Sequence, residues 1–480
     1  MFSKAAGTWP SEGMTMGTRN YDLEKSSEDW TEESHRQLNQ KNHGVFLRNL
    51  RYRLMSMYRR IFTLVFCVNL ALLLFLSIGE KPYLAKISNA SLGNLLAAVL
   101  IRNDNIINFL FRLFASMPTT WPLPIRRLGA KIYHLGGLHS GCAIFAVGWH
   151  LWLTIAMTRS ASADLPVASV LSVSLCYGIL VLLTLQATLA YPNLRQKHHN
   201  SFEYTHRYFG WMTVFLAWFL VLSLTRDLSQ ISGQSLGLAL ITSPAFWFLL
   251  FILMSIVSPW ALTRKMPIKI QVLSRHACRI YIYDRRFAKA YPGSFVRLST
   301  NPAGEWHSFA AIAESTENGG PGGYSVVVSN AGDWTGGMIS RAFEDTPKEI
   351  WIRGVPTCGV LHVAKMFRKI VLVATGSGIG PCLAVLRAGE VEARVLWSTR
   401  EPQATYGRAI VDDVLKADPQ AVIYDTQKRG RPDVVKMAYG IYIQAHAEAV
   451  IIISNPALTH RVVYGLESRG IPAFGAIWDS

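Results

Sequence analysis

The sequence predicts a membrane-embedded, all-α bundle of six helices, followed by an antiparallel β-barrel and then an α/β domain with a parallel sheet. Two observations support this fold class. Apolar residues make up 50% of the chain and crowd into 61–262, whereas 263–480 has an ordinary soluble composition. Within 263–480, short alternating segments give way to buried-type strands that alternate with helical stretches. The predicted boundaries are a disordered tail at 1–59, six spans within 60–263, a barrel at 264–368 and an α/β domain at 369–480.

The six spans come from apolar runs of the length that crosses a bilayer. Clear runs occur at 61–79, 132–157, 166–190 and 238–262, and weaker ones at 92–115 and 204–224. The Ser/Glu/Lys-rich tail lacks the apolar core of a signal peptide, so we expect no cleaved leader. The second span would place Arg102 and Asp104 near mid-membrane, where ionisable groups are costly. Two interpretations stay open: Arg102 faces a cofactor-bearing interior, or the span is short, tilted and packed inside the bundle.

The chain is strongly basic, with 48 Lys and Arg against 31 Asp and Glu, a net charge of +17 and a pI near 9.7. Most basic residues outside the soluble half flank one side of the predicted spans, while the outer loops hold only Lys81, Lys86, Arg159 and Arg226. Cytosolic loops of membrane proteins are enriched in Lys and Arg. We therefore expect both termini in the cytosol, a plasma membrane or endomembrane as the partner surface, and no nucleic-acid partner.

The soluble half contains two strand patterns. From 268 to about 353, alternating strands are separated by Gly, Pro and Asn turns, which is typical of a small antiparallel barrel. From 370 onward, the runs IVLVA, ARVLWS, AVIYD and AVIIIS each precede a helical stretch, which predicts βαβ units.

A glycine-rich loop joins the first parallel strand to the first helix of this region. It consists of Gly376, Ser377, Gly378, Ile379 and Gly380. Glycines let the backbone approach a pyrophosphate, and a helix N-terminus presents unpaired N–H groups to it. The loop predicts dinucleotide binding, with a structural tight turn as the alternative. Arg400, just after the next strand, is the candidate partner of a 2′-phosphate, which favours NADPH over NADH. Cys382 is interpreted as a packed thiol rather than a reactive one.

Three further motifs precede that loop in order. They are Pro292-Gly293-Ser294-Phe295-Val296, then His307-Ser308-Phe309-Ala310, then Gly332-Asp333-Trp334-Thr335. With the glycine loop, this arrangement resembles the flavin and nicotinamide domains of the ferredoxin-reductase superfamily, in the branch that includes ferric reductases and NADPH oxidases. It is most similar to fungal integral membrane flavoproteins of the TmpA type. The resemblance covers about 130–480.

The resemblance implies FAD and NADPH as cofactors. It places His307 and Phe309 along the flavin and assigns the flavin pyrophosphate to Gly332, Asp333, Trp334 and Thr335. It assigns the NADPH phosphates to Gly376–Gly380, and it makes Trp478 the catalytic-site residue that covers the isoalloxazine. The chain departs from the family pattern at Ser308 and Ala310, at Arg353-Gly354-Val355-Pro356 and at Ser454-Asn455-Pro456. The last two departures put the hydride-transfer site in doubt.

Histidines in the spans raise the question of a metal. Two imidazoles at similar depth on facing helices can ligate one haem iron. His206 of the fifth span could pair with His139 or His134 of the third, whereas His150 has no partner at its depth. The alternatives are one inner b-type haem or none; a second, outer haem lacks a ligand.

Three functions are compatible with these features. The first is a membrane flavin oxidoreductase that passes electrons from NADPH through FAD to an inner haem or another acceptor, not identified, near the membrane. The second is a scaffold or signalling protein that has lost hydride transfer; relatives of the resembled type are linked to sporulation or secondary metabolism. A third interpretation is a flavin enzyme acting on a hydrophobic metabolite.

Overall fold

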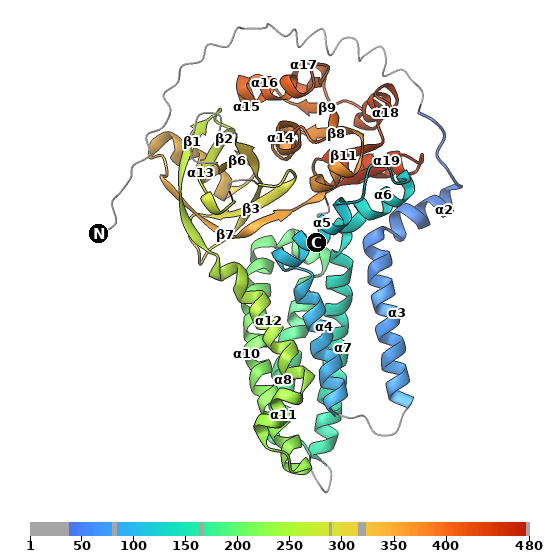
Figure 1. Cartoon of the computed structure of the whole chain (residues 1–480), viewed down its shortest axis with the longest axis vertical. Coiled ribbons are helices and arrows are strands. Elements are labelled where there is room, and N and C mark those ends of the chain that lie inside the picture. The colour runs from blue at the N-terminus through green and yellow to red at the C-terminus, as the bar shows by residue number, and fades with distance from the viewer. Residues whose placement is uncertain (1–37, 79–83, 163–166, 288–289, 315–322, 477–480) are drawn as a thin grey trace.

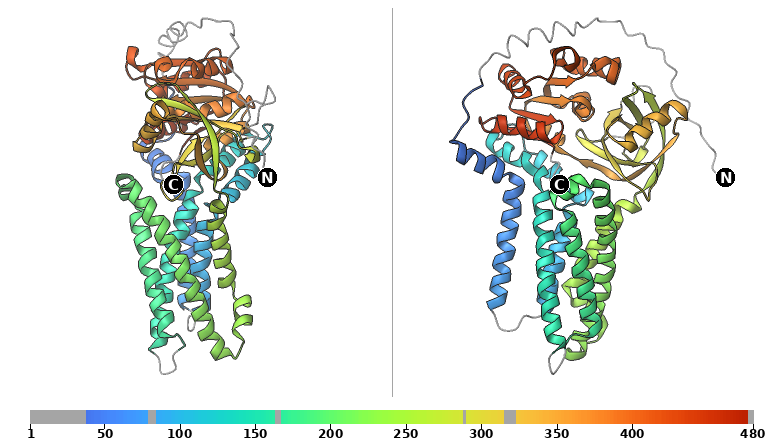
Figure 2. Two further views of the ribbon diagram at one scale, coloured as in Figure 1. Left: turned by 90° about the vertical axis from the view of Figure 1, so that its left-hand side faces the viewer. Right: turned by 180° about the vertical axis from the view of Figure 1, so that it is seen from behind.

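The computed structural model describes residues 38–78, 84–162, 167–287, 290–314 and 323–476. Long helices run side by side in one half of the molecule, and both β-sheets lie at one end of them (Figure 1). Views from the side and from behind show the same two-part shape (Figure 2). The sheets therefore form a compact head on a helical stem.

The stem contains five helices that are long and apolar enough to cross a membrane: α3 (Met57–Ile78), α7 (Gly136–Ala161), α8 (Val170–Leu189), α10 (His199–Ser232) and α12 (Pro244–Ala261). The pair α4 (Leu84–Leu100) and α5 (Asp104–Ala115) would be a sixth only if both helices counted as one span, because they meet at a bend of 69°. The shorter helices are α6 (Leu123–Gly129), η2 (Ala130–His134), α9 (Pro192–Lys197) and α11 (Leu236–Thr242).

The bend corrects the predicted second span at 92–115. Asn103 is extended, and its side-chain oxygen accepts a hydrogen bond from the Asn105 N–H, so that Asn103 caps α5. Its side-chain nitrogen donates to both Ser255 and Ser258 of α12. Asp104 is buried and receives hydrogen bonds at 2.9 Å from Arg297 in the head. The polar run 102–105 therefore ends α4 and turns α5 beneath the head, where the charge of Asp104 has a partner.

The first sheet is antiparallel and has seven strands in the order β4-β3-β7-β1-β2-β6-β5. The strands are β1 (Arg264–Val272), β2 (Ala277–Ile282), β3 (Ser294–Ser299), β4 (His307–Ala310), β5 (Ile312–Glu314), β6 (Gly323–Ser329) and β7 (Glu349–Cys358). The end strands β4 and β5 are separated in the chain by Ala311 alone, so the sheet curls round until its two ends meet in one segment, 307–314. The helix α13 (Asp333–Glu344) and the short turn η3 (Arg285–Phe287) accompany it.

The second sheet is parallel and has five strands in the order β10-β9-β8-β11-β12. They are β8 (Lys369–Thr375), β9 (Glu392–Thr399), β10 (Val422–Asp425), β11 (Ala449–Ile453) and β12 (Ala473–Gly475). The connecting helices are η5 (Gly376–Gly378), α14 (Ile379–Ala388), α15 (Pro402–Tyr406), α16 (Arg408–Ala417), α17 (Thr426–Arg429), α18 (Val434–Gln444) and α19 (Pro456–Glu467). The segment η4 (Val360–Met366) links the two sheets.

One hydrophobic core joins the stem to the parallel sheet. Phe111 of α5 and Ile132 of η2 belong to the same buried cluster as Met366 and Phe474. A second cluster fills the other face of the sheet beneath α18 and α19. Burial of apolar surface of this extent stabilises the junction, so the head and the stem behave as one unit.

An ion pair reinforces this junction. Arg126 of α6 is 2% exposed and donates to both carboxylate oxygens of Glu448, at 2.7 and 3.0 Å. The same guanidinium donates to the backbone oxygens of Trp121 and Met366. Glu448 also accepts the N–H of Arg368. Four of the five N–H donors of Arg126 and both carboxylate oxygens of Glu448 are thereby used.

Part of the predicted disordered tail is ordered. Residues 1–37 lie outside the described residues, but Val45–Asn49 form α2 and Leu50–Leu54 form η1. Arg48 donates to the hydroxyl of Tyr464 on α19, which in turn donates to Asn49. The Asn42 N–H also donates to the backbone oxygen of Ser468. These contacts hold residues 39–54 against the parallel domain.

Candidate functional site

The strand order of the parallel sheet reverses between β8 and β11, and such a switch point is where sheets of this kind form a binding crevice. In strand order, β9 and β10 lie to one side of β8, while β11 and β12 lie to the other. Ligands of such sheets bind outside the carboxyl ends of the strands at this switch point. The hydroxyls of Thr375, at the end of β8, and Ser454, just after β11, lie 2.5 Å apart across it. Sequence reasoning missed this pair, although it had named Ser454 as a departure from a family motif.

The predicted glycine loop borders the crevice. Gly376 has a φ of +51°, a conformation that favours glycine. Gly378 lies so close to β11 that an added Cβ would sit 2.2 Å from the backbone oxygen of Ile453. Ser377 is exposed between them, and Ile379 and Gly380 begin α14. The first turn of α14 is therefore held against β11; its Ile379 N–H already donates to the backbone oxygens of Gly376 and Ser377, and Pro381 has no N–H to offer an anion.

Two aromatic side chains, those of Trp397 and Tyr406, lie beside the glycine loop. The Trp397 indole donates to the Gly376 backbone oxygen at 3.0 Å, and its ring lies 5.4 Å from the ring of Tyr406. Tyr406 is almost fully buried, and burial raises the pKa of its phenol. The phenol therefore keeps its proton at neutral pH and can act as a donor. Tyr406 could not be identified from the sequence, because it lies far from the loop along the chain.

Arg400 follows β9, as predicted. Its guanidinium is 70% exposed and lies 3.7 Å from the Glu401 carboxylate. In sheets of this topology, the residue after the second strand is placed near the ribose of a bound dinucleotide. Cys382 is fully buried in α14, and burial raises its pKa to about 12, so the thiol is packed rather than reactive.

The barrel residues named from the resemblance also come together. The His307 and Trp334 rings stack at 4.5 Å, and Phe309 lies 5.8 Å from Trp334. His307 Nε2 lies 3.1 Å from the Glu305 carboxylate. The Trp334 indole N–H is buried and has no partner among the described residues.

The start of α13 suits a pyrophosphate less well. The Thr335 hydroxyl accepts the N–H groups of Ala331 and Gly332, so two amides that could bind an anion are already used. The carboxylate of Asp333 is exposed in the same turn and would repel a phosphate. These residues therefore fit an aromatic ring better than they fit an FAD pyrophosphate.

The structure separates the three candidate metal ligands. His139 of α7 and His206 of α10 face each other, with ring centres 6.4 Å apart. His139 Nδ1 bonds to the Ala98 backbone oxygen at 2.8 Å, and His206 Nδ1 is buried without a partner. The His134 ring, in η2, instead lies 4.3 Å from the Tyr133 ring and is tilted by 32° relative to it. No group of three or more His, Cys, Asp or Glu residues that could hold a metal ion occurs within the described parts of the chain.

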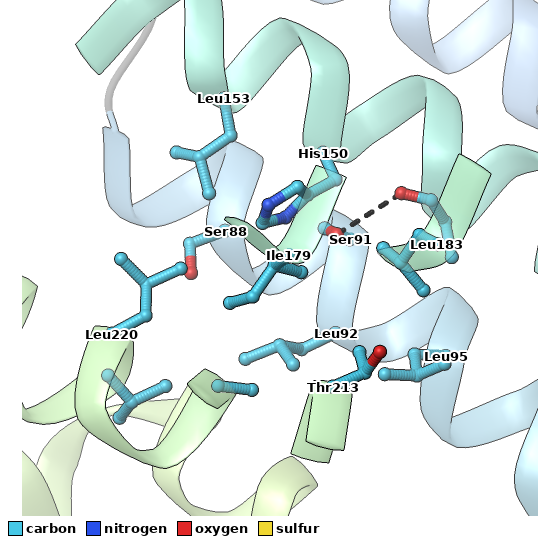
Figure 3. Close-up of a pocket in the computed structure, with 13 residues that line it drawn as sticks. Ser88, Ser91, Leu92, Leu95, His150, Leu153, Ile179, Leu183, Thr213 and Leu220 are labelled. Atoms are coloured by element: carbon cyan, nitrogen blue, oxygen red, sulfur yellow. Dashed lines mark hydrogen bonds between the residues drawn. The ribbon is translucent and has the colours of Figure 1, made fainter. Parts of the chain in front are cut away.

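His150 lines a small cavity in the stem, between α4, α7, α8 and α10 (Figure 3). Its Nε2 lies 3.1 Å from the Cys176 backbone oxygen, which satisfies that ring nitrogen. The cavity wall is mainly Leu, Ile, Val and Ala, with Ser88, Ser91 and Thr213 as polar exceptions. The Ser91 hydroxyl donates to the Ala146 backbone oxygen, the contact drawn in Figure 3. Trp478, the predicted catalytic residue, lies outside the described residues.

Comparison with known proteins gives similarities that the motifs did not indicate. A family model described as the C-terminal domain of adenylate-forming reductase 03009 matches residues 360–480. Two Coprinopsis cinerea proteins, adenylate-forming reductases 03009 and 06235, are 42% and 43% identical to this chain. The alignments cover 96% and 95% of the chain but 44% of each relative. The chain thus spans less than half the length of the curated relatives it matches.

Solved structures give only partial likenesses. The ferredoxin NADP+ reductase of Neisseria gonorrhoeae, with bound FAD and NADP, is 15% identical with a TM-score of 0.36; the match covers 44% of this chain and 97% of that one. Phthalate dioxygenase reductase is 17% identical with a TM-score of 0.33, over 45% of this chain and 68% of that one. At these scores, neither likeness assigns a function.

These findings correct the resemblance drawn from the motifs. The relatives are named adenylate-forming reductases, so the assignment to TmpA-type flavoproteins, ferric reductases and NADPH oxidases is wrong. The predicted electron transfer through FAD to an inner haem, and its scaffold alternative, are overturned with it. The motifs misled because short glycine-rich turns and caps recur in unrelated nucleotide-binding enzymes.

The fold class is corrected as well. The described chain is mostly helical with separate sheets, and the relatives do not support a six-helix membrane bundle joined to an FAD-binding barrel of ferredoxin-reductase type. Their names mention no membrane, FAD, haem or ferric-reductase property. They are named reductases, which agrees with the broader expectation of oxidoreductase chemistry.

Proposed function

We propose that this chain carries a nicotinamide-dependent reductase activity of the kind named in its relatives. The observation that supports it most is the switch point in strand order between β8 and β11, where the Thr375–Ser454 hydroxyl pair lies beside the start of α14. The loop Gly376–Gly380 would hold the pyrophosphate on those of its backbone N–H groups that have no partner within the loop. Gly378 makes this possible, because its lack of a side chain lets α14 approach β11.

An acyl group activated as an adenylate is the substrate class that the relatives' name suggests. A bound nicotinamide dinucleotide would supply a hydride to the carbonyl carbon of such a group, and AMP would leave to give an aldehyde. The hydroxyls of Thr375 and Ser454 are placed to donate a hydrogen bond at the mouth of the crevice. Because one hydroxyl donates to the other, the pair has one proton left, and this single donor would stabilise negative charge that develops on a carbonyl oxygen.

The test is a titration of the purified, detergent-solubilised protein with NADPH and NADH, followed by incubation with chemically prepared acyl adenylates. Saturable dinucleotide binding and AMP release that depends on NADPH or NADH are the expected results. A Ser454→Ala variant should bind the dinucleotide as the wild type does and turn over more slowly. A protein that binds neither dinucleotide would overturn the proposal.

Arg400 is expected to make NADPH the preferred dinucleotide. Arg400→Ala should weaken NADPH binding by about three- to tenfold, a modest factor because the guanidinium is exposed and screened. NADH binding should not change. The matched control is Arg408→Ala, which removes a guanidinium that is also exposed, at 60%, from α16, where Arg408 lies 3.8 Å from Asp412. Equal affinity of the wild type for both dinucleotides would remove this role for Arg400.

FAD and one haem are separate cofactor proposals that do not depend on the corrected electron-transfer function. The His307, Phe309 and Trp334 rings and the unpartnered Trp334 N–H support an aromatic ligand at the barrel. Two imidazoles on opposite sides of one iron place their ring centres about 6 Å apart. The 6.4 Å separation of His139 and His206 fits that arrangement, and the bond from His139 Nδ1 to Ala98 leaves Nε2 free to ligate.

A visible absorbance spectrum of the purified protein tests both cofactors. If haem is bound, we expect at most one per chain, lost in His206→Ala and in His139→Ala. His134→Ala and His150→Ala should retain it, because the His134 ring lies beside the Tyr133 ring and His150 bonds to Cys176. Haem that survives His206→Ala would contradict the assignment of this pair.

The location is also a proposal. The apolar faces of α3, α7, α8, α10 and α12 support insertion of the stem in a lipid bilayer, with the head and both termini on the cytosolic side. The partners proposed are the bilayer, the dinucleotide and the activated acyl substrate, without nucleic acid.

A further inference from the structure

A guanidinium without an acidic partner lies where the antiparallel sheet meets the ends of α10 and α12. Arg353 of β7 lies over the Trp260 ring at 4.6 Å and over the Trp306 ring at 4.8 Å. The two rings are 6.1 Å apart and nearly perpendicular. Arg353 forms no ion pair or hydrogen bond with any residue in the described part of the chain. Its N–H donors are therefore held in place but unused.

The neighbouring acids are already paired. Arg297 donates to both oxygens of Asp104 at 2.9 Å, and Arg207 bonds to Glu203. Three guanidinium groups thus share two carboxylates, which leaves one positive charge. Burial, followed by the nearby Arg297 and Arg207, lowers the pKa of Arg353 to about 10, with Asp104 and Glu203 acting in the opposite sense. Arg353 is consequently protonated at neutral pH.

The surroundings are those of a membrane surface. Tyr204, Tyr208 and Trp211 recur at helical spacing on α10, and each is at least 40% exposed. The Trp211 ring lies 5.5 Å from that of Trp260, so this aromatic band reaches the Arg353 site. Tyr and Trp are enriched at the level of lipid headgroups. If the stem spans a bilayer as proposed, Arg353 faces the headgroup layer on the side of the head.

We propose that Arg353, flanked by Trp260 and Trp306, binds the phosphate of an anionic phospholipid headgroup. A guanidinium offers parallel N–H donors that match two phosphate oxygens, and flanking aromatic rings hold its plane. Basic pockets beside membrane helices on the cytosolic side are suited to such headgroups. This inference rests on the proposed membrane location, but it does not depend on the dinucleotide site, which lies in the parallel sheet.

The experiment compares lipids on the intact, purified protein. Native mass spectrometry would count retained lipids after reconstitution in nanodiscs of phosphatidylcholine with phosphatidic acid of the same chain length. We expect the wild type to retain one phosphatidic acid in preference to phosphatidylcholine. Arg353→Gln should lower that preference by about tenfold, the loss expected for one charge-assisted contact. The preference of Arg353→Lys for phosphatidic acid should lie between those of the wild type and Arg353→Gln, because lysine keeps the charge and loses the paired donors.

Arg59→Gln on α3 is the matched control. It removes the same charge near the same end of the stem, from an exposed guanidinium that donates only to backbone oxygens of its own segment. Its preference for phosphatidic acid should stay within about twofold of the wild type. Inorganic phosphate added to lipid-free protein should not raise the melting temperature; if it does so as strongly as short-chain phosphatidic acid, the site binds soluble phosphate and the lipid proposal is overturned.

NADPH binding measured on the same samples separates this inference from the proposed function. A wild type that binds NADPH but shows no preference for phosphatidic acid, or an Arg353→Gln protein that keeps it, refutes the lipid site alone. Lipid selectivity without dinucleotide binding refutes the reductase proposal alone. Because the wild-type comparison needs no variant, the inference can fail even if Arg353→Gln does not fold.

Discussion

Replacing Ser377 by glutamate should weaken dinucleotide binding by roughly 10- to 100-fold, or about 1.4–2.7 kcal/mol, through repulsion between two anions at close range. Ser377 is exposed in the loop that leads into α14, so the new carboxylate would occupy the place proposed for the pyrophosphate. An acid at a helix N-terminus does not destabilise the helix; it contributes about 0.3–1 kcal/mol of stability. Loss of binding with an unchanged melting temperature, measured by titration calorimetry and thermal unfolding, is therefore the expected result.

Ser377→Ala is the control for this variant, and it should bind within about threefold of the wild type, since it adds no charge. Gly378→Val is a poor test of the same site. Its Cβ would lie 2.2 Å from the backbone oxygen of Ile453, so the variant should lose stability by about 1–3 kcal/mol or more through overpacking. Loss of binding would then follow from a displaced helix. Unchanged binding in Ser377→Glu would show that the loop is a structural turn.

The local parts of this site could be predicted from the sequence. The glycine loop and the strand before it are contiguous, and their residue types alone indicate a strand, a tight turn and a helix. The pairing of Thr375 with Ser454 could not be predicted, because it depends on β11 lying beside β8 across a separation of 79 residues. The position of Tyr406 beside the loop could not be predicted for the same reason, since the two are far apart in the chain.

In the helical stem, too, local features could be predicted from the sequence and contacts between distant segments could not. Helical periodicity placed His139 and His206 at a similar depth, but the choice between His139 and His134 required the packing of α7 against its neighbours. His134 belongs to η2, a separate turn before α7. The direction of its side chain therefore could not be extrapolated from the helical periodicity of the span. The bend at Asn103 was within reach of the sequence, since four consecutive polar residues interrupt the apolar run there. A search for apolar runs of fixed length averages the hydropathy over the whole run, so it did not detect this interruption.

Breaking the contact between Arg126 and Glu448 should produce the largest loss of stability. Arg126→Met is expected to lower the free energy of unfolding by about 2–4 kcal/mol, because it leaves a largely buried carboxylate with only the exposed Arg368 nearby. Thermal unfolding of the head, followed in detergent, measures the effect. The control is Lys369→Met, which breaks a pair with the exposed Glu392 in the same domain and should cost under about 1 kcal/mol.

The effect of Arg126→Met should depend on pH with a defined sign. The hydrogen bond from Arg126 is the main cause that lowers the pKa of the Glu448 carboxyl below its ordinary value of 4.5. A group whose pKa is lower in the folded state contributes stability that is complete above its unfolded pKa and disappears as the pH falls through its folded pKa. The difference in stability between wild type and Arg126→Met should therefore be constant from neutral pH down to about 5 and shrink below about 4. A difference that stays constant through this acidic range would mean that Arg126 stabilises the junction through its bonds to Trp121 and Met366 rather than through the charge of Glu448.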